Sequence, residues 1–121
     1  MIAVTKNYHD LKIWQRSHAL AVSLYQATKP FPKDEVFALT NQMRRACVSI
    51  PANIAEGCGR DGDAELKRFL TIALGSACEL DYYVLLAREL NYLDESASRR
   101  LGAELMELRC MLGSFVQRLK A

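Results

Sequence analysis

The sequence predicts an all-α protein, an up-down-up-down antiparallel four-helix bundle that forms one domain over residues 1–121. Apolar residues recur three and four positions apart along four long segments, no segment alternates apolar and polar residues as a strand does, and short turn-forming sequences separate the segments. The expected helices span about 10–29, 33–58, 63–90 and 95–120. With 121 residues, half of them hydrophobic, the chain can bury a core without disulfides or metal.

The first predicted helix follows an irregular arm, residues 1–9, and Asp10 is a plausible N-cap. The inner row of this helix is expected to be Leu11, Trp14, His18, Ala21, Tyr25 and Thr28, with a second apolar row of Ile13, Leu20 and Leu24. Trp14 is therefore predicted to anchor the core or an interface. Pro30 and Pro32 end the helix, because proline cannot donate the backbone hydrogen bond that would continue it.

The second predicted helix has acidic residues, Asp34 and Glu35, near its start, where the helix dipole favours them. Its core face is expected to be Leu39, Met43, Ala46, Ile50 and Ile54. A second face of apolar, mostly small side chains, Phe37, Val48, Ala52 and Ala55, exceeds what a monomer needs and predicts, with Trp14, an oligomer interface. Pro51 should kink the helix rather than restart it, since both faces keep their phase across it.

A polar stripe separates these two faces: Gln42, Arg45, Ser49, Asn53, Glu56 and Arg60. The favoured interpretation is a structural network with a neighbouring helix, because buried charges must be paired. In it, Glu79 accepts hydrogen bonds from Arg45, while Ser49 and Ser76 complete the network. The alternative is that Arg44, Arg45 and Arg60 reach outward to a phosphate-bearing partner.

The third predicted helix begins near Asp63, a fair N-cap. Its apolar seam is Leu66, Leu70, Ala73, Ala77, Leu80, Val84, Ala87 and Leu90. Asp94 or Ser96 should cap the fourth helix. The seam of that helix has the heptad-like spacing of bundle packing: Leu101, Leu105, Leu108, Leu112, Phe115 and Leu119.

No pattern in the sequence indicates catalysis, a cofactor or a metal. His9 and His18 stand in no metal-binding spacing. The glycine-rich stretch at 57–60 follows a helix instead of preceding one, so it does not resemble a phosphate-binding loop. The four cysteines form no C-x-x-C pair, no secretory signal precedes them, and no apolar run appears long enough to cross a membrane. We therefore expect a cytoplasmic, non-enzymatic protein with reduced, mostly buried thiols and neither cofactor nor membrane partner.

Four stretches in order carry a family resemblance: LKIWQRSHALAVSLYQAT, FPKDEVFAL, LTNQMRRACVSIPANIAEGCGR and RFLTIALGSACELDYYVLLARELNYL. With these, nearly the whole chain resembles the four-helix-bundle proteins first noticed as products of intervening sequences in bacterial 23S rRNA genes. The resemblance implies homo-oligomers, notably ring-shaped pentamers. It extends to accessory subunits of the reverse transcriptases of diversity-generating retroelements, a strongly basic group from which this chain departs, with a net charge of +2.

Two functional hypotheses follow. The first is a non-catalytic oligomer that binds structured RNA or a nucleoprotein, and the resemblance places it slightly ahead. The basic residues proposed for this contact are Arg44, Arg60, Lys67, Arg68, Arg99 and Arg100. The second is a protein–protein scaffold or adaptor that binds no nucleic acid, which the near-balanced charge and the small-residue face fit equally well.

Overall fold

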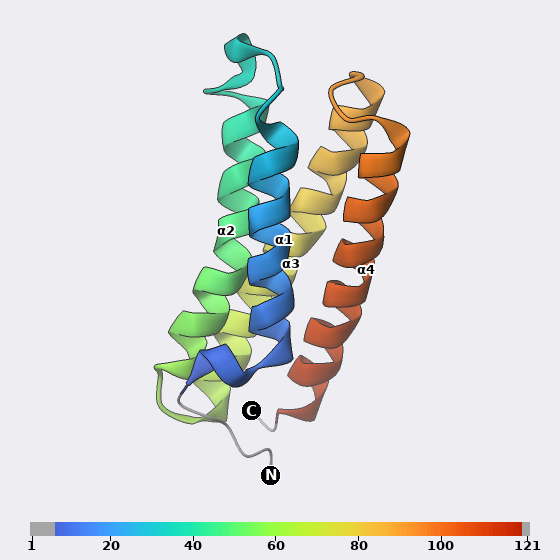
Figure 1. The fold of residues 1–121 in the computed structure, drawn as a ribbon. Helices are drawn as coiled ribbons and strands as arrows, with labels where there is room; N and C mark the ends of the chain where they lie inside the picture. Colours follow the sequence, from blue (N-terminus) through green and yellow to red (C-terminus); the bar gives the residue numbers. More distant parts are fainter. Residues whose placement is uncertain (1–6, 120–121) are drawn as a thin grey trace.

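Residues 7–119 are described in a computed structural model of the chain, and they form four α-helices and no strand. The α-helices are α1 (Lys12–Thr28), α2 (Leu39–Cys58), α3 (Gly62–Glu89) and α4 (Glu95–Arg118), and the 3₁₀ turns are η1 (Tyr8–Asp10) and η2 (Lys33–Glu35). Consecutive helices run in opposite directions (Figure 1). Helices α1 and α3 each pack against α2 and α4. The prediction of an all-α four-helix bundle is confirmed.

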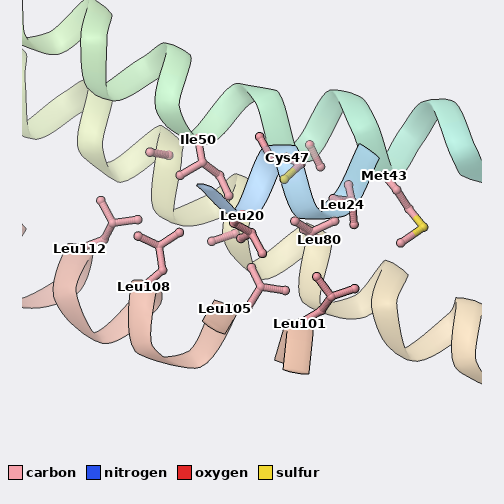
Figure 2. Packing of buried hydrophobic residues seen from close by; sticks show 14 of the residues in the cluster. Leu20, Leu24, Met43, Cys47, Ile50, Leu80, Leu101, Leu105, Leu108 and Leu112 are labelled. Carbon is pink, nitrogen blue, oxygen red and sulfur yellow. The ribbon is translucent and has the colours of Figure 1, made fainter. Parts of the chain in front are cut away.

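The core lies between the four helices and is almost entirely aliphatic. Figure 2 shows Leu20 and Leu24 of α1 meeting side chains of the other three helices. The fully buried large side chains are Leu20, Leu24, Met43, Ile50, Ile54, Leu66, Leu70, Leu80, Leu101, Leu105, Leu108 and Leu112. The predicted core face of α2 and the leucine seam of α4 from Leu101 to Leu112 are therefore buried, and only Leu90 of the predicted α3 seam is exposed.

The predicted inner row of α1 is only partly correct, because Ala21 and Thr28 are buried and the other members are not. The buried residues of this helix are Ile13, Ser17, Leu20, Ala21, Leu24 and Thr28, so the whole of the second predicted row faces the core together with two residues of the first. His18 and Tyr25 are exposed, and Trp14 is half-buried. The Trp14 ring stacks on His18, with centroids 4.9 Å apart and planes 5° from parallel. The three aromatic side chains of the predicted row, Trp14, His18 and Tyr25, made it look more hydrophobic than the shorter aliphatic row. Aromatic side chains with a polar atom are, however, also stable at a protein surface.

Several helix ends differ from the predicted ones. Helix α1 begins after Leu11, because Asp10 belongs to η1 and caps nothing. Helix α2 begins at Leu39 instead of 33, since the chain first makes η2 and a turn. The residue before α3 is Asp61, not Asp63. Asp94 does cap α4, through a 2.7 Å hydrogen bond from the Ala97 N–H. Most of the predicted arm (1–6) and the predicted end of the last helix at 120 lie outside the described residues.

Helix α2 continues through Pro51, so the helix does not restart there. Proline 51 is buried, and its lack of an N–H leaves the Cys47 carbonyl without the usual helical donor. Further along, α2 approaches α3 closely at Gly57. A Cβ atom built at Gly57 would lie 3.0 Å from Phe69 Cβ and 3.1 Å from Leu66 Cδ1, so only glycine fits without a shift of these neighbours.

Helix α3 corrects one expectation from the sequence. By length and composition it could cross a membrane, with a mean hydropathy of 1.4 over its most apolar window, whereas no such segment was predicted. Its seam from Leu66 to Ala87 is nevertheless buried against the other helices of the bundle. A helix in the core of a bundle can be equally long and apolar, so its length and hydropathy alone do not indicate a membrane span.

The α1–α2 and α3–α4 connections lie at the same end of the bundle (Figure 1). The Tyr92 hydroxyl donates a 2.8 Å hydrogen bond to Glu35 Oε2, and the Phe31 and Tyr92 rings lie 5.4 Å apart. The other carboxylate oxygen of Glu35 accepts the Leu39 N–H at 3.2 Å. Glu35 therefore holds both connections at the beginning of α2.

Candidate functional site

Two adjoining hollows lie where α1 ends and α2 begins. The larger, about 510 Å³, is lined by Tyr25, Val36, Thr40, Asn41, Arg44, Arg45, Val48 and Ser49. The smaller, about 310 Å³, is lined by Thr28, Lys29, Phe31, Pro32, Lys33, Val36, Thr40 and Arg44. They share Val36, Thr40 and Arg44, so we treat them as one site and call it the α2 entry hollow.

The α2 entry hollow is positively charged. Lys29, Lys33, Arg44 and Arg45 line it, and no carboxylate does. Within residues 7–119 none of these four forms an ion pair, whereas six other arginines do. In a chain with a net charge of only +2, four unneutralised cations at one end of the bundle are a segregated charge of the kind that attracts polyanions.

Arg44 is fixed in place by α1. Its Nε donates to Thr28 Oγ1 at 2.9 Å, and its Nη2 donates to the Tyr25 carbonyl at 3.3 Å. The guanidinium also lies over the Tyr25 ring, 4.6 Å from the centroid. All three partners are uncharged, so Arg44 keeps its full positive charge in a preorganised position.

Thr40 is the unusual residue of the α2 entry hollow. It is only 4% exposed, and its hydroxyl is the buried side-chain group of residues 7–119 that has no hydrogen-bond partner. Leaving a buried hydroxyl unpaired costs about 1–3 kcal/mol, and each such group in a folded protein calls for a partner. Because Thr40 lines both halves of the hollow, that partner can come from a bound molecule.

Val48 is one of the apolar residues that line the site, and Phe37 follows the lining residue Val36 in the chain. Phe37 lies in the chain between η2 and α2 and is 92% exposed, more than any other large hydrophobic residue described. Val48 is 42% exposed, Ala52 is exposed, and Ala55 is half-buried. The second apolar face predicted for this helix is therefore uncovered in one chain, and its role, like that of Trp14, in an oligomer interface stays a prediction.

Half of the six basic residues predicted to contact nucleic acid lie outside the α2 entry hollow and are paired with acids. Arg60 binds Glu56 at 3.0 Å, Arg68 binds Glu65 at 3.1 Å, and Arg99 binds Glu95 at 3.2 Å. The two partners of each pair are three or four residues apart in the chain, and the Arg68 and Arg99 pairs lie within α3 and α4. Such pairing cancels much of the local field, so these arginines are weaker candidates than the sequence suggested.

Of the remaining predicted contacts, Arg44 alone lies in the α2 entry hollow, while Lys67 is on α3 and Arg100 on α4. Lys29, Lys33 and Thr40 were not predicted for this role, and Arg45 was assigned first to the structural network. Two lysines flanking a Pro-Phe-Pro turn, followed by an arginine pair eleven residues later, are the signal that could have found them.

The predicted polar network forms only in part. Ser49 Oγ and Ser76 Oγ lie 2.8 Å apart across α2 and α3, and Asn53 Nδ2 donates to Ser49 Oγ at 2.9 Å. The predicted hydrogen bond from Arg45 to Glu79 is absent among the described residues. Glu79 instead accepts from the Tyr83 hydroxyl at 3.0 Å.

The side chains of Arg45 and Glu79 line the same recess of about 400 Å³. This recess is open to solvent at its rim, since both residues are exposed. Arg45 therefore bears no desolvation penalty that would require an ion pair. The same exposed guanidinium also lines the α2 entry hollow, where it is available to a ligand.

The cysteines and histidines suggest no reactive or metal centre. Cys47 and Cys58 are buried, while Cys78 and Cys110 are exposed, so half of the thiols, not most, are buried. Burial, with a smaller contribution from Glu104, raises the pKa of Cys47 to about 12. Residues 7–119 hold no group of three or more His, Cys, Asp or Glu side chains placed to bind a metal ion.

Comparisons with known proteins agree on the family. A sequence model of the family described as 23S rRNA-intervening sequence protein matches residues 9–114. Among solved structures, the chain is similar to a protein of unknown function from the S23 ribosomal protein family of Bacteroides thetaiotaomicron VPI-5482. The two are 25% identical, with a TM-score of 0.80 over 86% of this chain and 97% of that chain. The comparison with curated proteins gave no match.

Proposed function

The chain belongs to the 23S rRNA-intervening sequence protein family, and from this premise we propose that it is a non-catalytic homo-oligomer that binds structured RNA through the α2 entry hollow. The observation that carries the proposal is the group of four basic side chains without a carboxylate, Lys29, Lys33, Arg44 and Arg45. Phosphate contacts by lysine and arginine supply most of the affinity of such binding.

The exposed ring beside this charge suggests which part of an RNA would bind. Phe37 is 92% exposed and follows directly after Val36, which lines both halves of the hollow. Proteins recognise RNA mostly in single-stranded loops, where unstacked bases can lie on aromatic rings. We infer that a loop of a folded RNA places its phosphates in the hollow and a base on Phe37.

An oligomer would multiply this weak site. The family resemblance favours a pentamer, in which five copies of a small basic hollow act together on one RNA. Linked sites bind with an avidity well above that of each site alone, provided that the RNA can reach several of them. This explains how a protein with a net charge of +2 could hold RNA.

The proposal is tested with purified, nuclease-treated protein and a fluorescently labelled RNA stem-loop, by anisotropy at about 50 mM salt. The double variant Lys29→Ala/Arg45→Ala removes two exposed cations of the hollow. The matched control, Arg68→Ala/Arg99→Ala, removes the same charge from residues paired with acids. We expect roughly tenfold weaker binding for the first variant and less than about threefold for the control, since only the hollow contacts phosphates.

Equal effects of the two double variants would show that only net charge matters and would refute the assignment to the hollow. No binding by the wild-type protein would refute the RNA proposal as a whole.

The second candidate function is a protein–protein scaffold without nucleic-acid binding. The exposed apolar side chains of Phe37 and Val48, together with the exposed Ala52, favour it. Capture of partners from nuclease-treated lysate separates the two functions, because a protein partner survives that treatment and an RNA bridge does not. A partner that is retained by the wild-type protein and lost with Phe37→Ala would favour the scaffold.

A further inference from the structure

We propose that the first turn of α2 is a binding site for one phosphate-class oxyanion, built around the hydroxyl of Thr40. The inference deepens the proposed RNA binding, because it names the chemical group and the atoms that hold it. The inference rests on the proposed RNA binding only in taking the phosphate group to belong to an RNA. A free phosphate ion could occupy the same site.

The first observation is the unpartnered hydroxyl itself. Thr40 is 4% exposed, its Oγ1 has no hydrogen-bond partner, and the residue lines both halves of the α2 entry hollow. A threonine in the first turn of a helix normally has solvent or nearby backbone groups as partners for its hydroxyl. Here the hydroxyl has neither, and the residue that carries it lines the half of the hollow with a volume of about 510 Å³. An acceptor atom of a ligand is the missing partner.

The second observation is the state of the backbone around Thr40. The first N–H groups of a helix have no acceptor within the helix. In α2, the Leu39 N–H is bonded to Glu35 Oε1 at 3.2 Å, and the Gln42 N–H to the Ala38 carbonyl at 3.0 Å. The N–H groups of Thr40 and Asn41 lie between them and have no acceptor among the described residues. They are available to an anion, which the helix dipole also favours at this end.

The third observation is charge. Arg44 lies one helical turn after Thr40, fixed by Thr28 and Tyr25, and Arg45 follows it without an ion pair. Glu35 is the acid bonded to this turn, and its two oxygens are already used by Leu39 and Tyr92. A tetrahedral phosphate has enough acceptor oxygens to meet the hydroxyl, the two N–H groups and a guanidinium together.

The test is a titration of the ¹⁵N-labelled full chain with inorganic phosphate, at constant ionic strength kept with chloride and followed by amide chemical shifts. We expect saturable shifts of the Thr40 and Asn41 amides, with a Kd in the millimolar range that a few hydrogen bonds to one small anion can supply, on the order of 1–10 mM.

Two variants and one control make the test specific. Thr40→Val keeps the shape, removes the unpartnered hydroxyl, and should weaken phosphate binding about tenfold. Arg45→Ala alters an exposed side chain without ion pairs and should weaken it several-fold without disturbing the fold. Thr71→Val is the matched control, since the Thr71 hydroxyl is exposed on α3 and donates to the Lys67 carbonyl. It should leave phosphate binding unchanged.

The outcomes separate this inference from the proposed function. Absence of saturable amide shifts up to about 50 mM phosphate, or equal affinity of Thr40→Val and wild type, overturns the oxyanion site even if RNA binds. Phosphate binding that a short single-stranded RNA displaces supports both proposals. Phosphate binding that RNA cannot displace supports the site, assigns it to a free anion, and counts against RNA binding at the hollow.

Discussion

Replacing Gly57 by alanine should destabilise the bundle, although the same change usually strengthens a helix. In α2 the new methyl group would lie 3.0 Å from Phe69 Cβ and 3.1 Å from Leu66 Cδ1, both in the buried seam between α2 and α3. The helix gains up to about 1 kcal/mol from the replacement. Overpacking against a stiff Cβ atom costs about 1–3 kcal/mol. We therefore expect a net loss of about 0–2 kcal/mol.

Gly75→Ala is the matched control. Gly75 lies inside α3, and a Cβ there would meet nothing within 4 Å. This variant should gain only the stability that comes from the higher helix propensity of alanine, about 0.5–1 kcal/mol in the free energy of unfolding. The two variants should then differ by about 1–3 kcal/mol, or roughly 4–12 °C in Tm for a domain of this size. Thermal unfolding followed by circular dichroism measures this difference. If Gly57→Ala proves as stabilising as Gly75→Ala, the close approach of α2 and α3 at Gly57 is refuted.

Three further predictions concern other parts of the molecule. Ser76→Ala removes the 2.8 Å hydrogen bond to Ser49 and should lower the free energy of unfolding in urea by about 1 kcal/mol; a loss no larger than that of exposed Ser114→Ala would contradict this role. A thiol reagent at about pH 8 should modify the exposed Cys78 and Cys110 in the native protein, but Cys47 only after unfolding. The reason is that burial raises the pKa of Cys47 to about 12. Rapid labelling of Cys47 in the native protein would contradict its burial. Light scattering should give a multiple of the 13.6 kDa chain mass, reduced by Ala52→Glu and unchanged by Ala103→Glu; a wild-type monomer would rule out the proposed oligomer.

The fold could be predicted because its signal is repeated many times. Each long helix carries several apolar residues at bundle spacing, and the leucines from Leu101 to Leu112 alone define one face. Helix ends were less predictable, since a single local interaction decides them. The acidic residues at 34 and 35 suggested a helix start, whereas Glu35 accepts the Leu39 N–H from outside the helix. The row of α1 that faces inward also required knowledge of its neighbours, because Trp14 and Tyr25 suit a surface as well as a core.

The candidate site could be predicted only in part, because it depends on contacts between distant residues. The sequence shows that Arg44 and Arg68 are both basic, but not that Arg68 lies against Glu65 while Arg44 meets the uncharged Thr28. Lys29 and Arg45 are brought to one hollow by the antiparallel packing of α1 and α2. Whether the Thr40 hydroxyl has a hydrogen-bond partner depends on its neighbours in the folded protein, and no sequence pattern predicts this.

The central claim, that four unpaired cations of the α2 entry hollow bind the phosphates of RNA, is tested most directly by the salt dependence of affinity. RNA binding by the wild-type protein is measured between about 50 and 200 mM salt, and log K is plotted against log salt concentration. Four phosphate contacts predict a slope of about −3 per site, and the Lys29→Ala/Arg45→Ala variant should reduce its magnitude by about half. A slope near zero, or one that this variant leaves unchanged, would contradict the claim.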